Sequence, residues 1–233
     1  REKNMDFDFS DDQEQLRDAV RKYVDKGYTF DRRRAAEKAG GFDAAAYAEL
    51  AELGLTGLYV PEDDGGMGLG PIEGMVVMEE LGRGMVMEPL AQSLIAGAVL
   101  AGYADAATRA AWLPGVASGE KLVVLAYQER GSRYALDAIA GKAHQAPGGY
   151  VLNAIKTVVA AGDQADAYIV SAKVNSQLAL FLVERESAGV TTRGYGTQDG
   201  GRAAEVIVDG SSSHEVRKRE NPADLYALES RLS

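Results

Sequence analysis

The sequence predicts an α+β fold, with an N-terminal all-α helical domain over residues 5–120 and an antiparallel β domain over residues 121–210. Apolar residues recur at helical spacing in the first part. After Gly119 they form short runs separated by turn residues. A block of helices followed by a block of strands indicates α+β rather than an alternating parallel fold. In residues 211–233, leucines follow a polar stretch, so we expect a linker and the first turns of another helix.

The first two of five expected helices are marked by their ends. Ser10 and Gln13 match a capping box, which satisfies free N–H groups at a helix start, and Gly27 is a natural end for the helix that follows. A second helix fits residues 42–53, where apolar side chains fall on one face and Gly54 comes next.

Proline and aspartate mark the other three helices. Residues 71–81 and 89–99 each begin with proline, which is favoured at the first position of a helix. Asp105 caps a fifth helix, which is expected to break at Pro114 because proline lacks the N–H that continues the helical ladder.

Two turn sequences organise the strand block. Pro147-Gly148-Gly149 and Asn175-Ser176-Gln177 separate apolar runs, and each therefore predicts a hairpin. The expected strands are residues 122–128, 143–146, 150–160, 168–174, 178–184 and 203–208.

Composition excludes several classes of function. The chain of 233 residues has 35 Asp and Glu against 25 Lys and Arg, a net charge of −10, which argues against nucleic acid and anionic membrane surfaces as partners. It has no cysteine and only two histidines, so neither a disulfide, a thiolate nucleophile nor a metal site is expected. With no run of 18 apolar residues and no leader pattern, we expect a cytoplasmic protein with no membrane association.

Local motifs for catalysis are absent from the sequence. The glycine-rich residues 65–70 are the nearest match to a phosphate loop, but they lack its lysine, and a tight turn between helices explains them better. Gln128-Glu129-Arg130 lies at a strand end, where ligands often dock. The alternative is a solvated turn with a local ion pair, and Glu129 is expected to face solvent.

Other polar and methionine residues have simple structural interpretations. His144 is expected to be an ordinary surface or core residue, and Glu79 and Glu80 are expected to form a solvated helix face. Four methionines at helical spacing are expected to pack in the core; they are Met75, Met78, Met85 and Met87.

Several stretches together resemble the acyl-CoA dehydrogenase family. They are residues 52–62 (ELGLTGLYVPE), 64–69 (DGGMGL) and 78–83 (MEELGR), followed by LNAIK at 152–156, Ala165-Asp166, and residues 198–206. The resemblance covers about residues 5–210. Within the family, the pattern is most similar to the small subunit of pimeloyl-CoA dehydrogenases, which are heteromeric and act on dicarboxylic acyl-CoA.

The resemblance implies a fold and a reaction. Such proteins have a helical N-terminal domain, a middle β-barrel domain and a C-terminal four-helix domain, with FAD between the last two. A carboxylate removes the α-proton of the acyl-CoA while the β-hydride passes to the flavin. Here the C-terminal four-helix domain is expected to be absent. No catalytic residue is therefore assigned, and the chain alone is expected to be inactive.

The resemblance also implies which residues bind FAD. The family's first flavin segment falls at Tyr127, Gln128 and Ser132, with glutamine in place of a threonine. Its second segment falls at Val158 and Ala160, where the usual tryptophan and threonine are missing. Backbone groups could still hold the flavin. The alternative is a non-catalytic partner subunit with a degenerate flavin site.

The acyl pocket is expected between the N-terminal helices and the flavin, with Met87, Gln92 and Ser93 binding the substrate. A methionine wall suits variable chains, and the two polar residues could hydrogen-bond a distal carboxylate. Glu88 is expected in the first turn of a helix, where the helix dipole favours an acid. The implied partners are the acyl-CoA substrate, an electron-transfer flavoprotein or similar acceptor, and another acyl-CoA dehydrogenase subunit in a homo- or hetero-oligomer.

Overall fold

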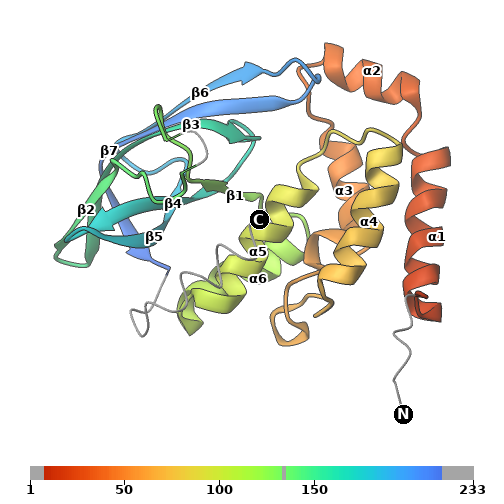
Figure 1. Cartoon of the computed structure of the whole chain (residues 1–233), viewed down its shortest axis with the longest axis horizontal. Helices are drawn as coiled ribbons and strands as arrows, with labels where there is room; N and C mark the ends of the chain where they lie inside the picture. The colour runs from red at the N-terminus through yellow and green to blue at the C-terminus, as the bar shows by residue number, and fades with distance from the viewer. Residues whose placement is uncertain (1–7, 133–134, 217–233) are drawn as a thin grey trace.

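A computed structural model of the chain describes residues 8–132 and 135–216, so the predicted helix after Ala223 lies outside the described residues (Figure 1). Helices and strands fall in the two blocks that the sequence predicts. The helices are α1 (Asp11–Lys26), α2 (Phe30–Lys38), α3 (Ala44–Glu52), α4 (Pro71–Arg83), α5 (Leu90–Tyr103) and α6 (Ala106–Ala117), with short 3₁₀ turns at Leu55–Gly57 and Glu62–Asp64. The strands are β1 (Val123–Ala126), β2 (Lys142–Ala146), β3 (Gly149–Ala160), β4 (Ala167–Val174), β5 (Gln177–Glu184), β6 (Val190–Gly196) and β7 (Arg202–Glu215).

The helix ends confirm most of the boundary signals. Ser10 accepts a hydrogen bond from the amide of Gln13 in a capping box, and α1 ends at Gly27. Two details differ from expectation. Helix α2 was not predicted, and α6 continues through Pro114 to Ala117. The proline removes one ladder hydrogen bond, but Val116 and Ala117 beyond it are buried in the core, which offsets the loss.

Asp43 starts α3 and ties it to α2. Its side chain accepts from the amides of Ala45 and Ala46, and from Arg32 Nε at 2.8 Å. Partial burial of Asp43 works against ionisation. The hydrogen bond from Arg32 and those from the two amides outweigh it and keep the pKa of Asp43 below its ordinary value.

Asp43→Ala is expected to lower the free energy of unfolding by about 1–2 kcal/mol, because the cap of α3 is lost. Asp43→Asn is the matched control, since asparagine caps equally well, and should lose less. A folded-state pKa below the unfolded one adds stability above the unfolded pKa, and this is lost as pH falls through the folded pKa. Urea titrations at pH 7 and pH 3 should show the deficit of Asp43→Ala narrowing in acid. An equal deficit at both pH values would contradict this origin.

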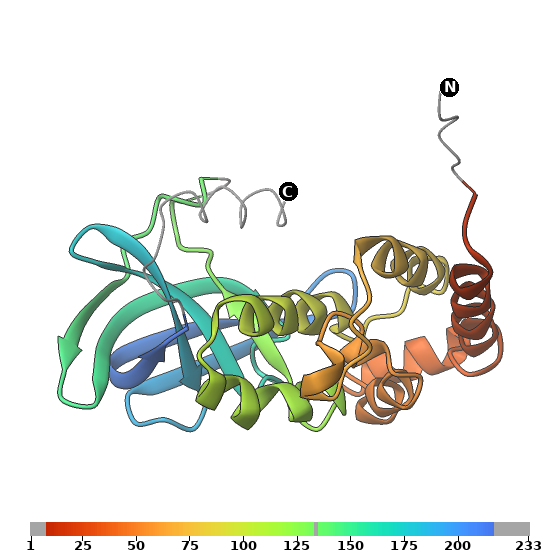
Figure 2. The same cartoon turned by 90° about the horizontal axis from the view of Figure 1, so that it is seen from below.

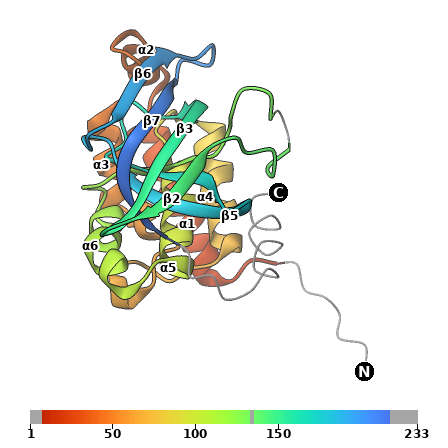
Figure 3. The ribbon, with the colours of Figure 1, turned by 90° about the vertical axis from the view of Figure 1, so that its left-hand side faces the viewer.

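The seven strands form one sheet that curls on itself (Figure 3). Pairings run from β4 to β2, β3, β7, β5 and back to β4, which makes the sheet barrel-like. Most pairs are antiparallel, as predicted. However, β1 pairs with β4 in parallel, and β2 meets β4 in parallel at a single position, so the sheet is mixed. Strand β6, which was not predicted, pairs with β7 and with no other strand of the described residues.

The core lies in three parts. One fills the inside of the curled sheet and includes Tyr168 and Phe181. The second joins α5 and α6 to β1, β4 and β5, and the third packs α1 against α4 and α5. Figure 2 shows the helical block beside the sheet, with α5 between them. The chain's two halves therefore share a buried boundary, although the domain boundaries at residues 120 and 210 stay predictions.

The surface of α4 departs from the expected pattern. Glu80 is almost fully buried and accepts hydrogen bonds from Arg21 of α1 at 2.6 Å and from Arg83 at 2.9 Å, so it joins two helices instead of facing solvent. Met75 and Met78 are exposed, not packed in the core. Helical spacing predicts which residues share a face but not which face is covered. No helix in the described part of the chain is long and apolar enough to cross a bilayer.

Candidate flavin site at the end of strand β1

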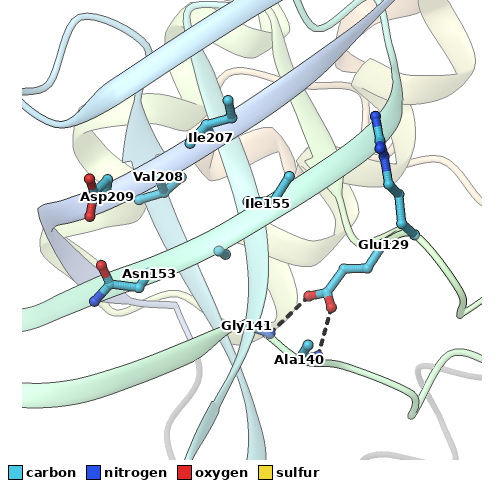
Figure 4. Close-up of a pocket in the computed structure, with 10 residues that line it drawn as sticks. Glu129, Ala140, Gly141, Asn153, Ile155, Ile207, Val208 and Asp209 are labelled. Carbon is cyan, nitrogen blue, oxygen red and sulfur yellow. Dashed lines mark hydrogen bonds between the residues drawn. The ribbon is translucent and has the colours of Figure 1, made fainter.

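The end of β1 is held by a buried ion pair. Lys156 of β3 is fully buried, and its Nζ donates to Glu129 Oε1 at 2.6 Å and to Ser171 Oγ at 2.9 Å. Glu129 is 7% exposed, so the expectation that it faces solvent is wrong. Its carboxylate also accepts from the amides of Ala140 at 2.6 Å and Gly141 at 3.1 Å (Figure 4).

Burial and pairing act in opposite directions on these two groups. Burial raises the pKa of Glu129, but the hydrogen bond from Lys156 and those from the two amides outweigh it and keep the pKa below the ordinary value. Burial lowers the pKa of Lys156, and Glu129 offsets only part of that shift. Neutralising either group would leave the charge of the other buried and unpaired.

This pair fixes the segment that carries the first predicted flavin residues. Lys156 Nζ also lies 3.4 Å from the carbonyl of Tyr127, and the carbonyl of Gln128 accepts from the amide of Thr157 at 2.8 Å. Ser132 closes the following turn, since its hydroxyl donates to the carbonyl of Glu129 at 2.8 Å. Residues 127–132 are therefore attached to β3 and are not a free loop.

The second predicted flavin segment lies on a bulge of β3. The pairing of β3 with β7 shifts between Lys156 and Val159, so Thr157 and Val158 have no partner there. Val158 has a left-handed φ of 53°, a conformation that costs free energy for a β-branched residue. Its side chain is 54% exposed. Such strain is typical of functional sites and persists only where the surroundings impose it.

The two predicted flavin segments, residues 127–132 and 158–160, lie side by side. Their predicted flavin-binding residues are either exposed or half-buried. Tyr127 is 47% exposed, like Val158, whereas Gln128, Ser132 and Ala160 are half-buried. The hydrogen bond between Gln128 and Thr157 places both segments side by side. The result is an edge with two exposed apolar side chains and one amide side chain.

A hollow of about 530 Å³ lies next to this edge, on the outer face of β3 and β7 (Figure 4). Ile155 and Ile207 give it an apolar floor, and Asn153 and Asp209 lie at one end. Ile155 is 54% exposed. The Glu129 carboxylate lies at the other end, beside the amide of Ala140 that donates to it.

The predicted acyl-pocket residues lie elsewhere, at the junction of the helices with the β6–β7 turn. Met87 is half-buried, its amide donates to the Tyr28 hydroxyl at 3.2 Å, and its sulfur lies beside Gly200. Gln92 is half-buried on the first turn of α5. Ser93 is fully buried on the same turn. None of these three residues lines the hollow beside Glu129.

Glu88 is placed differently from expectation. Helix α5 begins at Leu90, with Pro89 as its cap, so Glu88 precedes the helix and does not lie in its first turn. It is 6% exposed, and one carboxylate oxygen accepts from the amide of Asp43 at 3.4 Å. Burial raises the pKa of Glu88.

Comparison with known proteins finds similarity to one family. Residues 10–120 match the family described as acyl-CoA dehydrogenase, N-terminal domain. Benzylmalonyl-CoA dehydrogenase of Aromatoleum aromaticum is 31% identical over 201 residues, which cover 80% of this chain and 51% of that protein. Acyl-CoA dehydrogenase FadE27 of Mycobacterium tuberculosis is 27% identical over 216 residues, covering 92% of this chain and 57% of that protein. The chain thus spans about half the length of the curated relatives it matches.

Solved structures agree with these relatives. The Tcur3481-Tcur3483 steroid ACAD superposes with a TM-score of 0.85 at 29% identity, covering 93% of this chain and 59% of that one. The ChsE4-ChsE5 complex of Mycobacterium tuberculosis gives 0.85 at 26% identity, covering 96% and 61%. Residues 10–120 thus match the N-terminal domain of the acyl-CoA dehydrogenase family, and the chain as a whole is similar in sequence and fold to members of that family.

Proposed function

We propose that the chain is part of an FAD-dependent acyl-CoA dehydrogenase that removes hydrogen from the α- and β-carbons of an acyl-CoA. The observation that carries the proposal is the edge at Tyr127, Gln128 and Val158, which the buried Lys156–Glu129 pair and the bulge of β3 hold in place. The family supports the general reaction. A dicarboxylyl-CoA substrate, a kinship with pimeloyl-CoA dehydrogenase small subunits and a cytoplasmic location are finer parts of the same proposal.

The residues at this edge suit one part of a flavin. Exposed Tyr127 and Val158 offer apolar contact to a ring, and the Gln128 amide can donate a hydrogen bond to its polar edge. Ala160 and Ser132 flank these residues. FAD, when bound, supplies the acceptor for the hydride of the substrate. The chain's own contribution is to hold the ring through apolar side chains and backbone, since no aromatic wall is present at Val158.

The described residues at this site do not include a free general base. Glu129 is the nearest carboxylate, but Lys156 and the amides of Ala140 and Gly141 occupy both of its oxygens. Its pKa also lies below the ordinary value, which makes it a weaker proton acceptor. The base is therefore proposed to come from outside residues 8–132 and 135–216.

A second candidate is a non-catalytic subunit of a heteromeric acyl-CoA dehydrogenase. Val158 and Ala160 supply neither an aromatic ring nor a hydroxyl, so few side chains at this site can contact the flavin. One structural neighbour is named as a complex of two proteins, ChsE4 and ChsE5. We propose a homo- or hetero-oligomer with another acyl-CoA dehydrogenase subunit, and an electron-transfer flavoprotein or similar acceptor as the oxidant.

Flavin binding by the full protein, together with its partner subunit where one exists, tests the site. Val158→Glu is expected to weaken FAD binding more than tenfold, because a carboxylate would be buried against the ring. Ile72→Glu is the matched control: Ile72 is 51% exposed on α4, far from β3, and should bind FAD as the wild type does. The measurement is quenching of flavin fluorescence.

The outcomes separate the two candidates. The first candidate, a catalytic chain, is supported if the wild type binds FAD, Val158→Glu loses it, and the bound flavin bleaches when acyl-CoA is added. Flavin that resides only on the partner subunit, with Val158→Glu having no effect, favours the non-catalytic subunit. If both glutamate variants weaken FAD binding equally, the proposed site is wrong.

A further inference from the structure

Arg33 of α2 joins two segments that are far apart in the sequence. The tip of the β6–β7 hairpin lies against α2 (Figure 1), and the loop between α4 and α5 lies beside both. Arg33 Nε donates to the Met85 carbonyl in this loop at 3.2 Å, and its Nη2 donates to the Asp199 carbonyl in the hairpin turn at 2.7 Å. The Arg33 side chain is 16% exposed, so it lies mostly within the contact that it makes.

The loop segment that Arg33 holds begins with a strained residue. The amides of Met85 and Val86 bond back to the carbonyls of Gly82 and Leu81, each at 3.0 Å, which is the Schellman pattern at the end of α4. The left-handed position of this pattern usually holds glycine, but here Met85 adopts it with a φ of 51°. A side chain in this conformation costs free energy, and the bond from Arg33 to the Met85 carbonyl supports it.

Glycine backbone lets the hairpin tip approach both α2 and the loop. A Cβ added to Gly200 would lie 3.2 Å from Met87 Sδ and 3.1 Å from Glu37 Cγ, and a Cβ added to Gly41 would lie 2.5 Å from the Gly200 carbonyl oxygen. Both glycines have positive φ values, 89° and 86°. The sulfur of Met87 therefore packs against the same turn that Arg33 holds.

Other bonds make the hairpin tip a fixed support. Arg202, at the start of β7, donates to the Gly40 carbonyl at 2.9 Å and to Asp163 Oδ2 at 2.6 Å. Asp199 closes the turn from within, since its Oδ1 accepts from the amide of Gly201 at 3.1 Å. The tip is thus fastened to α2 and to its own strands, and Arg33 extends this support to the α4–α5 loop.

We infer that Arg33 is a positioning residue that limits the length of the acyl pocket by keeping Met87 in place. This inference rests on the proposed function, in which Met87 belongs to the substrate pocket. Met87 is held from three sides: its amide donates to the Tyr28 hydroxyl at 3.2 Å, its sulfur packs beside Gly200, and its loop is fastened at Met85. Methionine adapts its shape where it has room, and the hairpin tip removes that room.

Three variants of α2 separate the role of Arg33 from its charge. Arg33→Met keeps an apolar stem but frees the hairpin tip from the loop, so Met87 can withdraw toward Gly200 and a longer acyl chain fits. Arg33→Lys keeps the charge, but one ammonium group does not reproduce the fork that serves two carbonyls. Arg34→Met is the matched control, because Arg34 is exposed on the same helix and lies 5.9 Å from the Phe30 ring.

The test uses the full protein, with its partner subunit where one exists, and straight-chain acyl-CoAs of increasing length. We measure KM and kcat for each substrate, and calorimetry gives the Kd of the matching 2-enoyl-CoA products without turnover. In Arg33→Met, KM and Kd are expected to fall about tenfold for chains longer than the wild-type optimum, with kcat on the optimal chain nearly unchanged. Arg33→Lys should lie between the two, and Arg34→Met should match the wild type.

A double variant checks that Arg33 acts through Met87. In a Met87→Ala background, Arg33→Met should add no further shift, because the wall that it positions is gone. Equal weakening at all chain lengths, with a lower melting temperature, would give Arg33 a purely structural role and overturn the inference, as would an unchanged length profile. A wild type that neither binds nor oxidises any acyl-CoA overturns the proposed function, and this inference with it.

Discussion

Lys156→Met is expected to lower the free energy of unfolding by about 3–5 kcal/mol, because it leaves the Glu129 carboxylate buried without its counter-charge. Methionine fills nearly the same volume as the lysine stem, so the loss reports the charge and not a cavity. The carboxylate keeps only the amides of Ala140 and Gly141, and Ser171 loses the ammonium donor at 2.9 Å. Urea unfolding followed by circular dichroism measures the change.

Two further variants isolate the origin of that loss. Arg130→Met breaks an exposed pair, since Arg130 lies 3.4 Å from Glu205 with its side chain 84% exposed, and should cost less than about 1 kcal/mol. Lys156→Met/Glu129→Leu removes both buried charges and should recover part of the loss. If Lys156→Met/Glu129→Leu were no more stable than Lys156→Met, the unpaired charge would not be the cause.

The pH dependence of this difference has a definite sign. The pKa of Glu129 in the folded wild type lies below its unfolded value of about 4.3. Its contribution to stability is therefore complete above that pH and is lost as pH falls through the folded pKa. In Lys156→Met burial is no longer offset by Lys156, so the pKa of the carboxyl rises and it takes up a proton as pH falls. The difference in free energy of unfolding between wild type and variant should therefore narrow toward acid pH.

The helix ends could be predicted from the sequence because they depend on signals from a few neighbouring residues. Ser10 and Asp105 stand at helix starts because their side chains accept hydrogen bonds from free amides, and Gly27 caps the end of α1 by donating its amide to the Tyr23 carbonyl; these signals are visible in a short window. Helix α2 was missed because its nine residues, FDRRRAAEK, are mostly polar and carry little apolar periodicity. Strand β6 was missed for the same reason, since most of its residues are exposed and, among the described strands, it pairs with β7 alone.

The candidate site shows where such reasoning ends. The strand end at Tyr127 and Gln128 could be identified from the apolar run that precedes it. The burial of Glu129 could not, because its partner Lys156 lies 27 residues away and charged residues are usually exposed. The parallel contact of β1 with β4 is likewise set by long-range packing on α5. The bulge at Val158 leaves no signal in the sequence, since valine is a poor choice for a left-handed φ.

The second large effect on stability is expected in the glycine-rich turn of residues 65–70, which follows the 3₁₀ turn at Glu62–Asp64. Four amides of residues 66–69 bond back to carbonyls of residues 57–61, among them Gly68 to Val60 at 2.8 Å and Met67 to Gly57 at 2.9 Å. The turn also contains Gly65 and Gly68 at positive φ, so the prediction of a tight turn is confirmed. The turn therefore folds back tightly onto its own backbone.

Gly66→Ala is expected to lower the free energy of unfolding by about 3 kcal/mol, at the upper end of overpacking costs. Its Cβ would lie 2.1 Å from the Val60 carbonyl oxygen and 2.6 Å from that of Gly57, and both oxygens are backbone atoms already held by hydrogen bonds. Gly82→Ala is the matched control: Gly82 is exposed on α4 with nothing within 4 Å of the added Cβ, so alanine should raise stability by up to about 1 kcal/mol. Urea titrations of both variants give the two changes directly. A loss below about 1 kcal/mol in Gly66→Ala would mean that the turn can open, and that the packing of Val60 against α5 and α6 does not depend on it.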